Sequence, residues 1–565
     1  MNKVASTLAG LCVLAAGCAA GIHALAKKRA ESMDCHLGNA KDFKKYQSLM
    51  SEDTDENVIF GTFLGNPFGL SLDSVKTNRS TNVLTIGGSD SERKDYIKYN
   101  IMQENSSAVV VSTNQELFLE LAPNLIAKEY PVYWLNLSDF MVSSHYNPLQ
   151  YLYYANGEIN EIQVDIFADL LSKQIQKEGK QDDPFRDWHK QFIVALLYYV
   201  LESKHIPESE KCLNTVLKKA QMETGEENSP LSMEIETWIR ETKENSQSYA
   251  IRAKAFYEAY QSSKNRAKIA LDVVSALQLF ARKEVDSITR IDKRSLDKNI
   301  DFDKILSRQG YLFVTVPKDN RDYDFLLSVF FSQFYSTAYE GGEKTYRGKY
   351  YVGYRKGTSV NGSFDTEEEA KKYCKPDMIV WSGNEYAGKD PALPVHVNIF
   401  LDDFTNLGEL KNFTIVLATC RKYRIGNHCI INSLEELEKV YPNGEHESLR
   451  ANIDTILYFG GKNVKESDAE FIKSYLEKVN LYYQWKKISS EGYSINYTPT
   501  IQSPLSIEEI LAIGKDNTDE IIMARNRHPF ICQKCKPENH KRYKEYHDAS
   551  KMFGYVSTAY HKIFK

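Results

Sequence analysis

The sequence predicts an α/β protein in which a mostly parallel sheet is interrupted by an all-helical segment and preceded by one membrane-spanning helix. Three observations predict this arrangement. Short apolar runs alternate with helix-like segments, helical spacing of apolar residues takes over in one long central stretch, and an uncharged apolar stretch opens the chain. With 565 residues, 42% of them hydrophobic, the chain is long enough for roughly two or three folded domains.

The composition excludes some classes of protein. The formal net charge is −5, so the chain as a whole is not a basic nucleic-acid binder, and any contact with DNA would come from local patches. Nine cysteines are scattered along the chain, most of them singly, which indicates a reducing compartment rather than a disulfide framework.

The first residues predict a membrane anchor. Residues 4–26 contain no Asp, Glu, Lys or Arg, and the basic cluster Lys27–Arg29 follows at once. At about 1.5 Å per residue, a helix of this length crosses a hydrocarbon core of about 30 Å, and the basic cluster predicts that the rest of the chain is cytoplasmic. We therefore assign residues 1–30 to a single-pass anchor and residues 31–56 to a polar linker. The alternatives are a cleaved secretory signal or a lipid-attachment site at Cys18.

Strand-like apolar runs recur on both sides of a helical stretch. Residues 156–295 carry apolar residues at helical spacing with few Gly or Pro, so we expect an all-α domain there. The sheet domain then comprises residues 57–155 and 296–505. Its strand-like runs are Val58–Gly69, Val83–Ile86, Ala108–Val111, Val132–Leu135, Gly310–Pro317, Val395–Phe404, Asn427–Ser433 and Asp454–Gly461.

Two further segments are set apart from the sheet domain. Residues 341–390 predict an insertion with a hairpin and a short helix, and Thr366 with Glu369 has the spacing of a capping box at the start of that helix. Residues 506–565 are assigned to a C-terminal tail.

The stretch "VLTIGGSDSERKDYIKYN", Val83–Asn100, begins like a phosphate-binding loop. Such a loop reads G-x-x-x-x-G-K-[ST], because backbone N–H groups wrap the phosphates and a Lys reaches the terminal ones. In this chain Glu92 stands at the second Gly, Arg93 at the Lys and Lys94 at the Ser or Thr.

The run "VHVNIFLDDF", Val395–Phe404, is the partner that such a loop needs. A buried strand that ends in two carboxylates, Asp402 and Asp403, is typical of a Walker B site. There the first carboxylate holds Mg²⁺ through water and the second polarises the attacking water. An ordinary strand end followed by a helix cap is the alternative interpretation.

Taken in order, the motifs resemble those of the coupling proteins of type IV secretion and conjugative DNA transfer. These TraG-type proteins are relatives of the RecA-like and FtsK-like P-loop ATPases. The similar segments are "FLGNPFGLSL…NVLTIGGS", "YNPLQYL", "DPFRDWHKQFIVALLYYV", "LPVHVNIFLDDFTNLGELKNFTIVLATCRKYRIGNHCIINS", "ANIDTILYFGGKN" and "SPLSIEEI…IIMARNRHPF…HKRYK". The Walker B block is the most specific of them, because its whole order of residue types recurs.

The resemblance implies a RecA-like nucleotide-binding domain with an all-α insertion, which binds ATP with Mg²⁺ and assembles as a hexamer on the bacterial inner membrane. It also implies roles for particular residues, by position in the family's motifs. Asp402 is the Mg²⁺ residue, and Asp403, Arg421 and Asn432 are the catalytic candidates. The nucleotide-binding candidates are Gly87, Gly88, Ser89, Ser91, Arg93 and Lys94.

Several of these positions depart from the family's pattern. The family's loop reads GGSGSGKT, so a carboxylate at Glu92 would face a phosphate of like charge and fill space that only Gly leaves open. Asn432 replaces a sensing Gln, and Tyr423 replaces the second of two neighbouring arginines. We therefore expect the chain to be a coupling protein with impaired hydrolysis that recruits DNA or relaxosome proteins to the secretion channel. The alternatives are an active DNA-translocating ATPase and a purely structural interaction protein.

The C-terminal tail holds a possible zinc site. Cys532, Cys535 and His540 lie close together in the sequence, with His547 further on. A single C-x-x-C is a weak zinc signal, so the alternative is that both thiols lie on a surface tail without a metal.

Overall fold

A computed structural model describes most of the chain after the predicted anchor. The described residues are 44, 46–154, 156–175, 184–242, 248–291, 293, 296–318, 322–343, 349–353, 361–383, 392–476, 479–489, 492–515 and 519–555. The predicted membrane helix at residues 4–26, and the linker up to residue 43, lie outside them. Within this described part, no helix is both long enough and apolar enough to cross a membrane.

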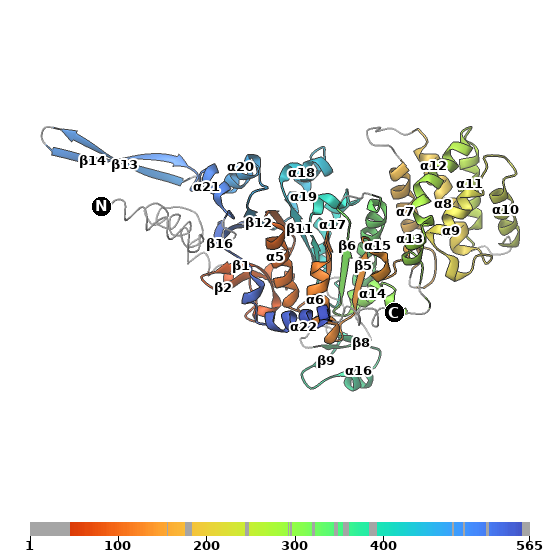
Figure 1. Ribbon diagram of the computed structural model, residues 1–565, viewed down its shortest axis with the longest axis horizontal. Coiled ribbons are helices and arrows are strands. Elements are labelled where there is room, and N and C mark those ends of the chain that lie inside the picture. Colours follow the sequence, from red (N-terminus) through yellow and green to blue (C-terminus); the bar gives the residue numbers. More distant parts are fainter. Residues whose placement is uncertain are drawn as a thin grey trace. The chain divides into compact units, whose positions relative to one another are not determined.

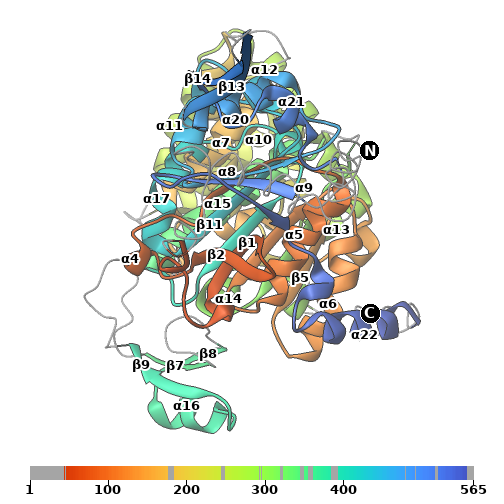
Figure 2. The same ribbon diagram turned by 90° about the vertical axis from the view of Figure 1, so that its left-hand side faces the viewer.

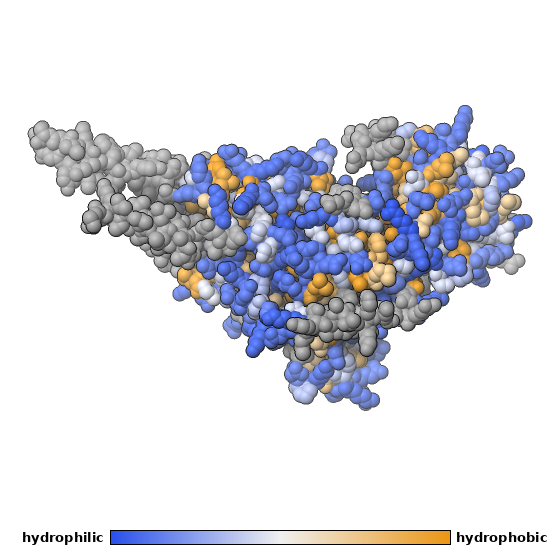
Figure 3. Space-filling model, in the orientation of Figure 1, coloured by the Kyte–Doolittle hydropathy of each residue, from blue (hydrophilic) through white to orange (hydrophobic). Residues whose placement is uncertain are grey.

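The described residues divide into two compact units. The first comprises the described residues up to Val132, Asp303–Leu312 and the described residues from Ala338 onward. The second comprises the described residues of Tyr133–Phe302 and Phe313–Thr337. Figure 1 shows the second unit as a group of helices, and Figure 3 shows that the described surface facing the viewer is mostly hydrophilic, with small separate hydrophobic groups.

Eleven strands of the described residues form one sheet. In spatial order they are β2 (Asn66–Ser71), β1 (Asn57–Phe63), β16 (Phe530–Lys534), β15 (Asp519–Ala524), β12 (Thr455–Gly460), β3 (Val83–Gly87), β11 (Ile425–Ile431), β10 (Val397–Leu401), β4 (Ser107–Ser112), β6 (Tyr311–Thr315) and β5 (Val132–Asn136). The five strands from β12 to β4 pair in parallel, whereas β15, β16, β1 and β2 pair antiparallel. The predicted α/β class with a large, mostly parallel sheet is confirmed.

The central strands are parallel because helical connections cover both faces of the sheet. Strands β3, β4, β10, β11 and β12 are buried along their whole length, as expected for a sheet covered on both faces. The connection β3–α5–β4 steps across the sheet in one direction, and β10–α17–β11 steps in the other. Right-handed crossovers therefore place α5 (Asp90–Met102) and α17 (Phe413–Thr419) on opposite faces, as Figure 2 shows.

The other helices of the first unit follow the same scheme. They are α4 (Ser74–Thr77), α6 (Glu116–Ala127), α14 (Phe302–Ser307), α18 (Leu434–Val440), α19 (Glu445–Ala451), α20 (Glu466–Tyr475), α21 (Ile507–Ala512) and α22 (Tyr543–Tyr555). Helix α22 packs along α6, and α5 contacts α6 and β1.

The second unit is built around one buried helix. Its helices are α7 (Glu161–Ile175), α8 (Arg186–Glu202), α9 (Leu213–Gln221), α10 (Pro230–Thr242), α11 (Ala250–Gln261), α12 (Arg266–Leu277), α13 (Lys283–Ile288) and the first part of α15 (Asp324–Glu343). Helix α8 is buried continuously from Phe192 to Leu201 and contacts α7, α9, α11 and α12. A helix that is apolar on all sides occupies the centre of a helical core.

The segment that we predict as an insertion folds into a small sheet and a helix. Strands β8 (Gly362–Phe364), β7 (Tyr350–Gly353) and β9 (Ile379–Ser382) pair antiparallel, and α16 (Glu367–Tyr373) packs on them. Thr366 caps α16, and its side chain accepts a hydrogen bond from the Glu369 amide at 3.3 Å. A separate two-stranded hairpin, β13 (Val479–Ser489) with β14 (Gly492–Gln502), was not anticipated from the sequence.

The residues at both ends of the described chain belong to the sheet domain, contrary to the sequence interpretation. The tail supplies β15 and β16, and the polar linker contributes contacts to them. Tyr46 packs against Phe530 and donates a hydrogen bond to the His528 carbonyl at 3.0 Å. Asp55 is buried and paired with Lys541 at 2.6 Å and Arg542 at 2.7 Å. Burial alone would raise the pKa of Asp55, but these two cations lower it below its ordinary value.

Candidate functional site

The carboxyl ends of the central strands bring the predicted site residues together. Gly87 ends β3, Asp402 follows β10, and Asn432 follows β11. Because these strands are parallel and neighbouring, all three residues meet at one edge of the sheet. In open α/β sheets this is the edge where ligands bind.

The glycine loop at this edge is short. Strand β3 ends at Gly87 and α5 begins at Asp90, so only Gly88 and Ser89 lie between them. Gly87 and Gly88 have φ of 81° and 85°, and the Gly88 amide donates to the Gly460 carbonyl at 2.8 Å. The residues that would wrap a phosphate in a P-loop therefore form the first turn of a helix here.

Ser89 and Glu92 explain why the helix starts early. Ser89 is the N-cap, and its side chain accepts a hydrogen bond from the Glu92 amide at 3.4 Å. The Glu92 carboxylate accepts the Ser89 amide hydrogen in return, at 2.5 Å. This reciprocal capping box stabilises the helix start with the very carboxylate that replaces the loop's second glycine.

Arg93 lies between the two carboxylates of the Walker B position. Its Nε is 3.1 Å from Asp402 Oδ1, and its Nη2 is 3.0 Å from Asp403 Oδ1. Its Nη1 donates to Asn432 Oδ1 at 2.6 Å. Arg93, Asp402 and Asp403 are all buried, with side-chain exposures of 5%, 0% and 4%. We call these four residues the Arg93 cluster.

The surroundings of Asp402 shift its ionisation. Burial raises the pKa of Asp402, the Arg93 guanidinium opposes this, the nearby Asp403 adds to it, and the net pKa is about 6. Its Oδ1 accepts the Asp403 amide at 3.1 Å, but its buried Oδ2 has no hydrogen-bond partner among the described residues. Asp403 itself adopts a left-handed backbone conformation with φ of 51°, and the Thr113 hydroxyl donates to its Oδ2 at 3.4 Å.

Glu92 has a partner from the far end of the chain. Its Oε1 forms a buried ion pair with Lys534, the last residue of β16. The two side chains are 8% and 4% exposed, and the Lys534 ammonium also lies 5.4 Å from the centre of the Phe459 ring. The C-terminal segment thereby neutralises the carboxylate that stands in the glycine loop.

Lys94, which follows Arg93 in α5, forms ion pairs with two acidic residues. Its ammonium lies 2.6 Å from Asp90 Oδ2 and also contacts Glu116. Burial alone would lower the pKa of Lys94, but the hydrogen bonds to Asp90 and Glu116 raise it above its ordinary value. Ser91 is exposed, so its side chain takes no part in this network.

The donor set at this edge does not fit Mg²⁺ with a nucleotide as the residues are arranged. Two carboxylates are the ligands that Mg²⁺ prefers, but the Arg93 guanidinium already contacts both of them. Lys94 stands where the P-loop hydroxyl would bind the metal, and the first turn of α5 replaces the open loop. The cation of this site is part of the protein chain.

Arg421 lies at the opposite edge of the sheet, contrary to its assignment to this site. It precedes β11, and its guanidinium donates to the carbonyl and the side-chain oxygen of Asn78, both at 3.1 Å. Asn78 itself precedes β3, so both residues lie at the amino ends of the strands. Within one chain, Arg421 cannot reach the carboxylates at the carboxyl ends.

The candidate zinc residues are buried in separate contacts, contrary to the expectation of a surface tail. Cys532 Sγ donates to Glu520 Oε1 at 3.3 Å, Cys535 packs with Ile59 and Tyr99, and His540 Nε2 is 2.9 Å from Gln103 Oε1. Burial raises the pKa of both thiols. In the part of the chain that the structure describes, no three His, Cys, Asp or Glu residues form a group able to hold a metal ion.

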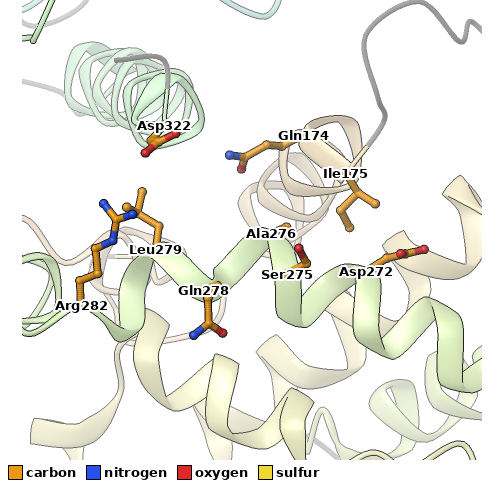
Figure 4. A pocket seen from close by; sticks show the side chains of 9 residues that line it. All are labelled: Gln174, Ile175, Asp272, Ser275, Ala276, Gln278, Leu279, Arg282 and Asp322. Atoms are coloured by element: carbon orange, nitrogen blue, oxygen red, sulfur yellow. The ribbon is translucent and has the colours of Figure 1, made fainter. Parts of the chain in front are cut away.

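The second unit has a cavity of its own, of about 410 Å³. Figure 4 shows Gln174 of α7, Arg282 and Asp322 around its opening, with Asp272 and Ser275 of α12 on one wall. One cation, two carboxylates, two amides and apolar groups line it. This mixture does not favour any one class of ligand.

The fold and the Arg93 cluster together define the class of protein. A glycine loop follows β3, an acidic pair ends β10, and β11 lies between these two strands. This is the arrangement of a P-loop α/β domain, and here Arg93 lies between its two acidic residues.

The comparisons with known proteins then identify the family. Residues 47–350 and 378–548 match the family described as Type IV secretory system Conjugative DNA transfer, and the chain belongs to this family. Among solved structures, the bacterial conjugative coupling protein TrwBdeltaN70 in complex with sulphate is similar, with 12% identity, a TM-score of 0.52, and coverage of 88% of this chain and 93% of that chain. Plasmid coupling protein TrwB in complex with ADP and Mg²⁺ has 12% identity and a TM-score of 0.51 over the same shares. No curated protein matches the sequence.

Sequence reasoning located the loop and the acidic pair but missed how they are neutralised. The sequence gives no signal that Lys534 pairs with Glu92, since the two residues are 442 positions apart. A signal for Arg93 did exist. A cation one turn into the helix after a glycine loop can reach the carboxyl end of the acidic strand.

We expect the loss of one charge of the Glu92–Lys534 ion pair to lower the free energy of unfolding more than the loss of both charges. Replacing Lys534→Met leaves a buried carboxylate without its cation, which costs about 3–5 kcal/mol of unfolding free energy. Adding Glu92→Gln removes that charge but keeps an acceptor for the Ser89 amide, so the double variant should recover at least half of the loss. Urea unfolding at pH 7 measures the three midpoints.

The exposed pair Lys371–Glu367 on α16 supplies the control, because Lys371→Met should leave the urea midpoint unchanged. Equal unfolding free energies for the single Lys534→Met and the double variant would contradict a coupled pair.

We expect Asp402 to make the free energy of unfolding fall as the pH rises from about 4 to 7. Its folded pKa of about 6 lies above the ordinary value of 3.8, so the folded chain holds this proton in a range where the unfolded chain releases it. The two-unit difference corresponds to about 3 kcal/mol at neutral pH. In Asp402→Asn this contribution disappears, so unfolding at pH 5 and at pH 7 should differ less than in the unsubstituted protein. An unchanged pH dependence would show that Asp402 is ionised throughout this range.

Proposed function

We propose that this protein is a coupling protein of conjugative transfer that works without hydrolysing ATP. It recruits DNA, or the relaxosome proteins that process DNA, to the type IV secretion channel. Residues 4–26 anchor it in the bacterial inner membrane as a single span, and it acts in a homo- or hetero-oligomer, hexameric by analogy with its family.

One observation carries the proposal: the Arg93 guanidinium is 3.1 Å from Asp402 and 3.0 Å from Asp403. Hydrolysis by a P-loop enzyme needs the first carboxylate for Mg²⁺ and the second for the attacking water. In this chain an ion pair occupies both carboxylates, and Asn432 supplies a third contact to the same cation. No nucleotide is needed to neutralise the acidic pair.

The surrounding contacts support the same conclusion. For Mg²⁺ to bind Asp402, Arg93 would have to leave two buried carboxylates. For a phosphate to enter the loop, the capping box of Ser89 with Glu92 and the ion pair of Glu92 with Lys534 would both have to open. An active DNA-translocating ATPase therefore requires several buried contacts to break in each turnover.

The family supports the recruiting role. The match to Type IV secretory system Conjugative DNA transfer extends over both structural units, so the fold that members of this family use is present. The departures from the family's loop, Glu92, Arg93 and Lys94, lie at the carboxyl edge of the sheet, whereas Tyr423 lies at the opposite edge. A protein altered in this way retains surfaces for partners while its nucleotide site is closed.

We expect the full chain, purified in detergent, to show no binding of Mg-ATP in calorimetry and to release no phosphate above background with DNA present. A repaired variant, Glu92→Gly with Arg93→Lys, Lys94→Thr and Lys534→Leu, should bind Mg-ATP. The fourth substitution is needed because the first would leave Lys534 buried without a partner. The same variant with Asp402→Ala is the matched control and should not bind.

Turnover by the unsubstituted protein that Asp402→Ala abolishes would contradict the proposal and favour the active ATPase. DNA binding separates a recruiting protein from a purely structural one, because phosphate contacts give a steep salt dependence. Weak association with DNA that does not change between roughly 50 and 200 mM salt would favour the structural alternative.

A further inference from the structure

The first unit also contains a cavity. It lies at the edge of the sheet opposite to the Arg93 cluster. Its volume is about 470 Å³, and it is lined by the residues before β12, those after β15, and the ends of α19 and α20. Strand β12 runs from this cavity to Gly460, which contacts the glycine loop. A strand of that length spans about 20 Å, so the cavity is separate from the Arg93 cluster.

Three arginines line this cavity, which we call the arginine pocket. Arg525 is held in place, since its Nε is 3.4 Å from Asp454 Oδ1 and its Nη2 donates to the Ala451 carbonyl. The guanidinium of Arg450 lies over the Phe471 ring, 4.7 Å from its centre. Arg527 is the third, and its Nε has no hydrogen-bond partner among the described residues.

The arginines leave hydrogen-bond donors unused. The Nε atoms of Arg450 and Arg527 are buried, and neither has a hydrogen-bond partner among the described residues. A guanidinium stays charged at any accessible pH, so it cannot avoid the cost of such donors by losing a proton. An anion in the pocket would therefore meet permanent positive charge.

A fourth arginine adds positive charge beside the pocket. Arg79 donates from its Nη2 to the Arg525 carbonyl at 2.7 Å. Burial lowers the pKa of Arg79, and the like charges of Arg527 and Arg525 lower it further, against the opposing effect of Asp454. The two acidic residues of the pocket are Asp454 and Glu447, whose Oε1 lies 4.0 Å from Arg450 Nη2, and they balance only part of this positive charge.

Apolar and aromatic residues also line the pocket. Ile453, Ile456 and Met523 are buried, and the rings of Phe471 and Tyr475 lie 5.0 Å apart. Tyr475 is 45% exposed, so its ring is open to a ligand. Aromatic rings and guanidinium planes are the surfaces on which nucleic-acid bases stack.

We propose that the arginine pocket binds a nucleoside phosphate, with the phosphate on Arg450 and Arg527 and the base against Tyr475. A cavity of this size is in the range of small-ligand sites. The arginines would neutralise the phosphate directly through charge-assisted hydrogen bonds, so binding needs no Mg²⁺. The ligand is either a free nucleotide or the terminal nucleotide of a single strand. This site is independent of the proposed function, since it lies at the edge opposite the closed loop.

The test is calorimetry on the full chain in detergent with EDTA present. The probes are AMP, adenosine, inorganic phosphate and a 5′-phosphorylated pentanucleotide. We expect AMP to bind at one site per chain, more tightly than adenosine or phosphate. Arg527→Gln should weaken AMP at least tenfold, because it removes charge-assisted hydrogen bonds. Lys439→Gln, an exposed cation on α18, is the control and should change nothing.

The comparison of the pentanucleotide with AMP shows whether the ligand is the end of a single strand or a free nucleotide. Tighter binding of the pentanucleotide than of AMP, lost in Arg527→Gln, identifies the end of a strand, and tighter binding of AMP identifies a free nucleotide. Either result supports the pocket. If Arg527→Gln unfolds, as circular dichroism would report, Arg527→Lys keeps the charge without the planar fork and should still weaken AMP several-fold.

Three results would overturn the inference. Inorganic phosphate binding as tightly as AMP would show that the base is not recognised. The absence of AMP binding would overturn the pocket while leaving the proposed function intact. Nucleotide binding that requires Mg²⁺ and responds to Lys94→Gln but not to Arg527→Gln would place the ligand in the glycine loop, and would contradict the pocket and the proposed function together.

Discussion

The arrangement of the residues at the carboxyl edge of the sheet depends on the ion pairs of Arg93 with Asp402 and Asp403. Two adjacent carboxylates that are almost fully buried need a cation close by. A nucleotide-dependent relative can receive that cation with its ligand, whereas this chain carries it on the helix that follows the glycine loop. The early start of that helix, the capping box and the neutralisation of Glu92 are all compatible with a site that is complete without a ligand.

The organisation of the sheet could be predicted because it depends on local patterns. Buried parallel strands such as β10 and β12 are short apolar runs that end at glycines or acids, and each is visible in the sequence on its own. Strand β16 was missed because the apolar part of "FICQK" is only three residues long, and it is a strand through its pairing with β1 and β15. The contact of Lys534 with Glu92 depends on that pairing, so no local pattern could indicate it.

The cysteines show how secondary structure limits an inference from spacing. In a loop, C-x-x-C can bring two thiols to one metal. In an extended strand, side chains alternate between faces, so residues an odd number of positions apart point to opposite sides. Cys532 accordingly contacts Glu520, while Cys535, just after the strand, packs with Ile59 and Tyr99.

The position of β16 also bears on the order in which the chain can fold during synthesis. Within the sheet, the first hairpin, β1–β2, is joined only through β16, with Gly61 opposite Lys534. A ribosome makes β1 long before β16, since Thr62 and Gln533 are 471 positions apart, and domains otherwise tend to fold from the amino terminus as they emerge. The hairpin must therefore wait, with one edge unpaired, until β16 has been translated. A nascent chain consequently depends on a strand that is made much later to join the β1–β2 hairpin to the sheet.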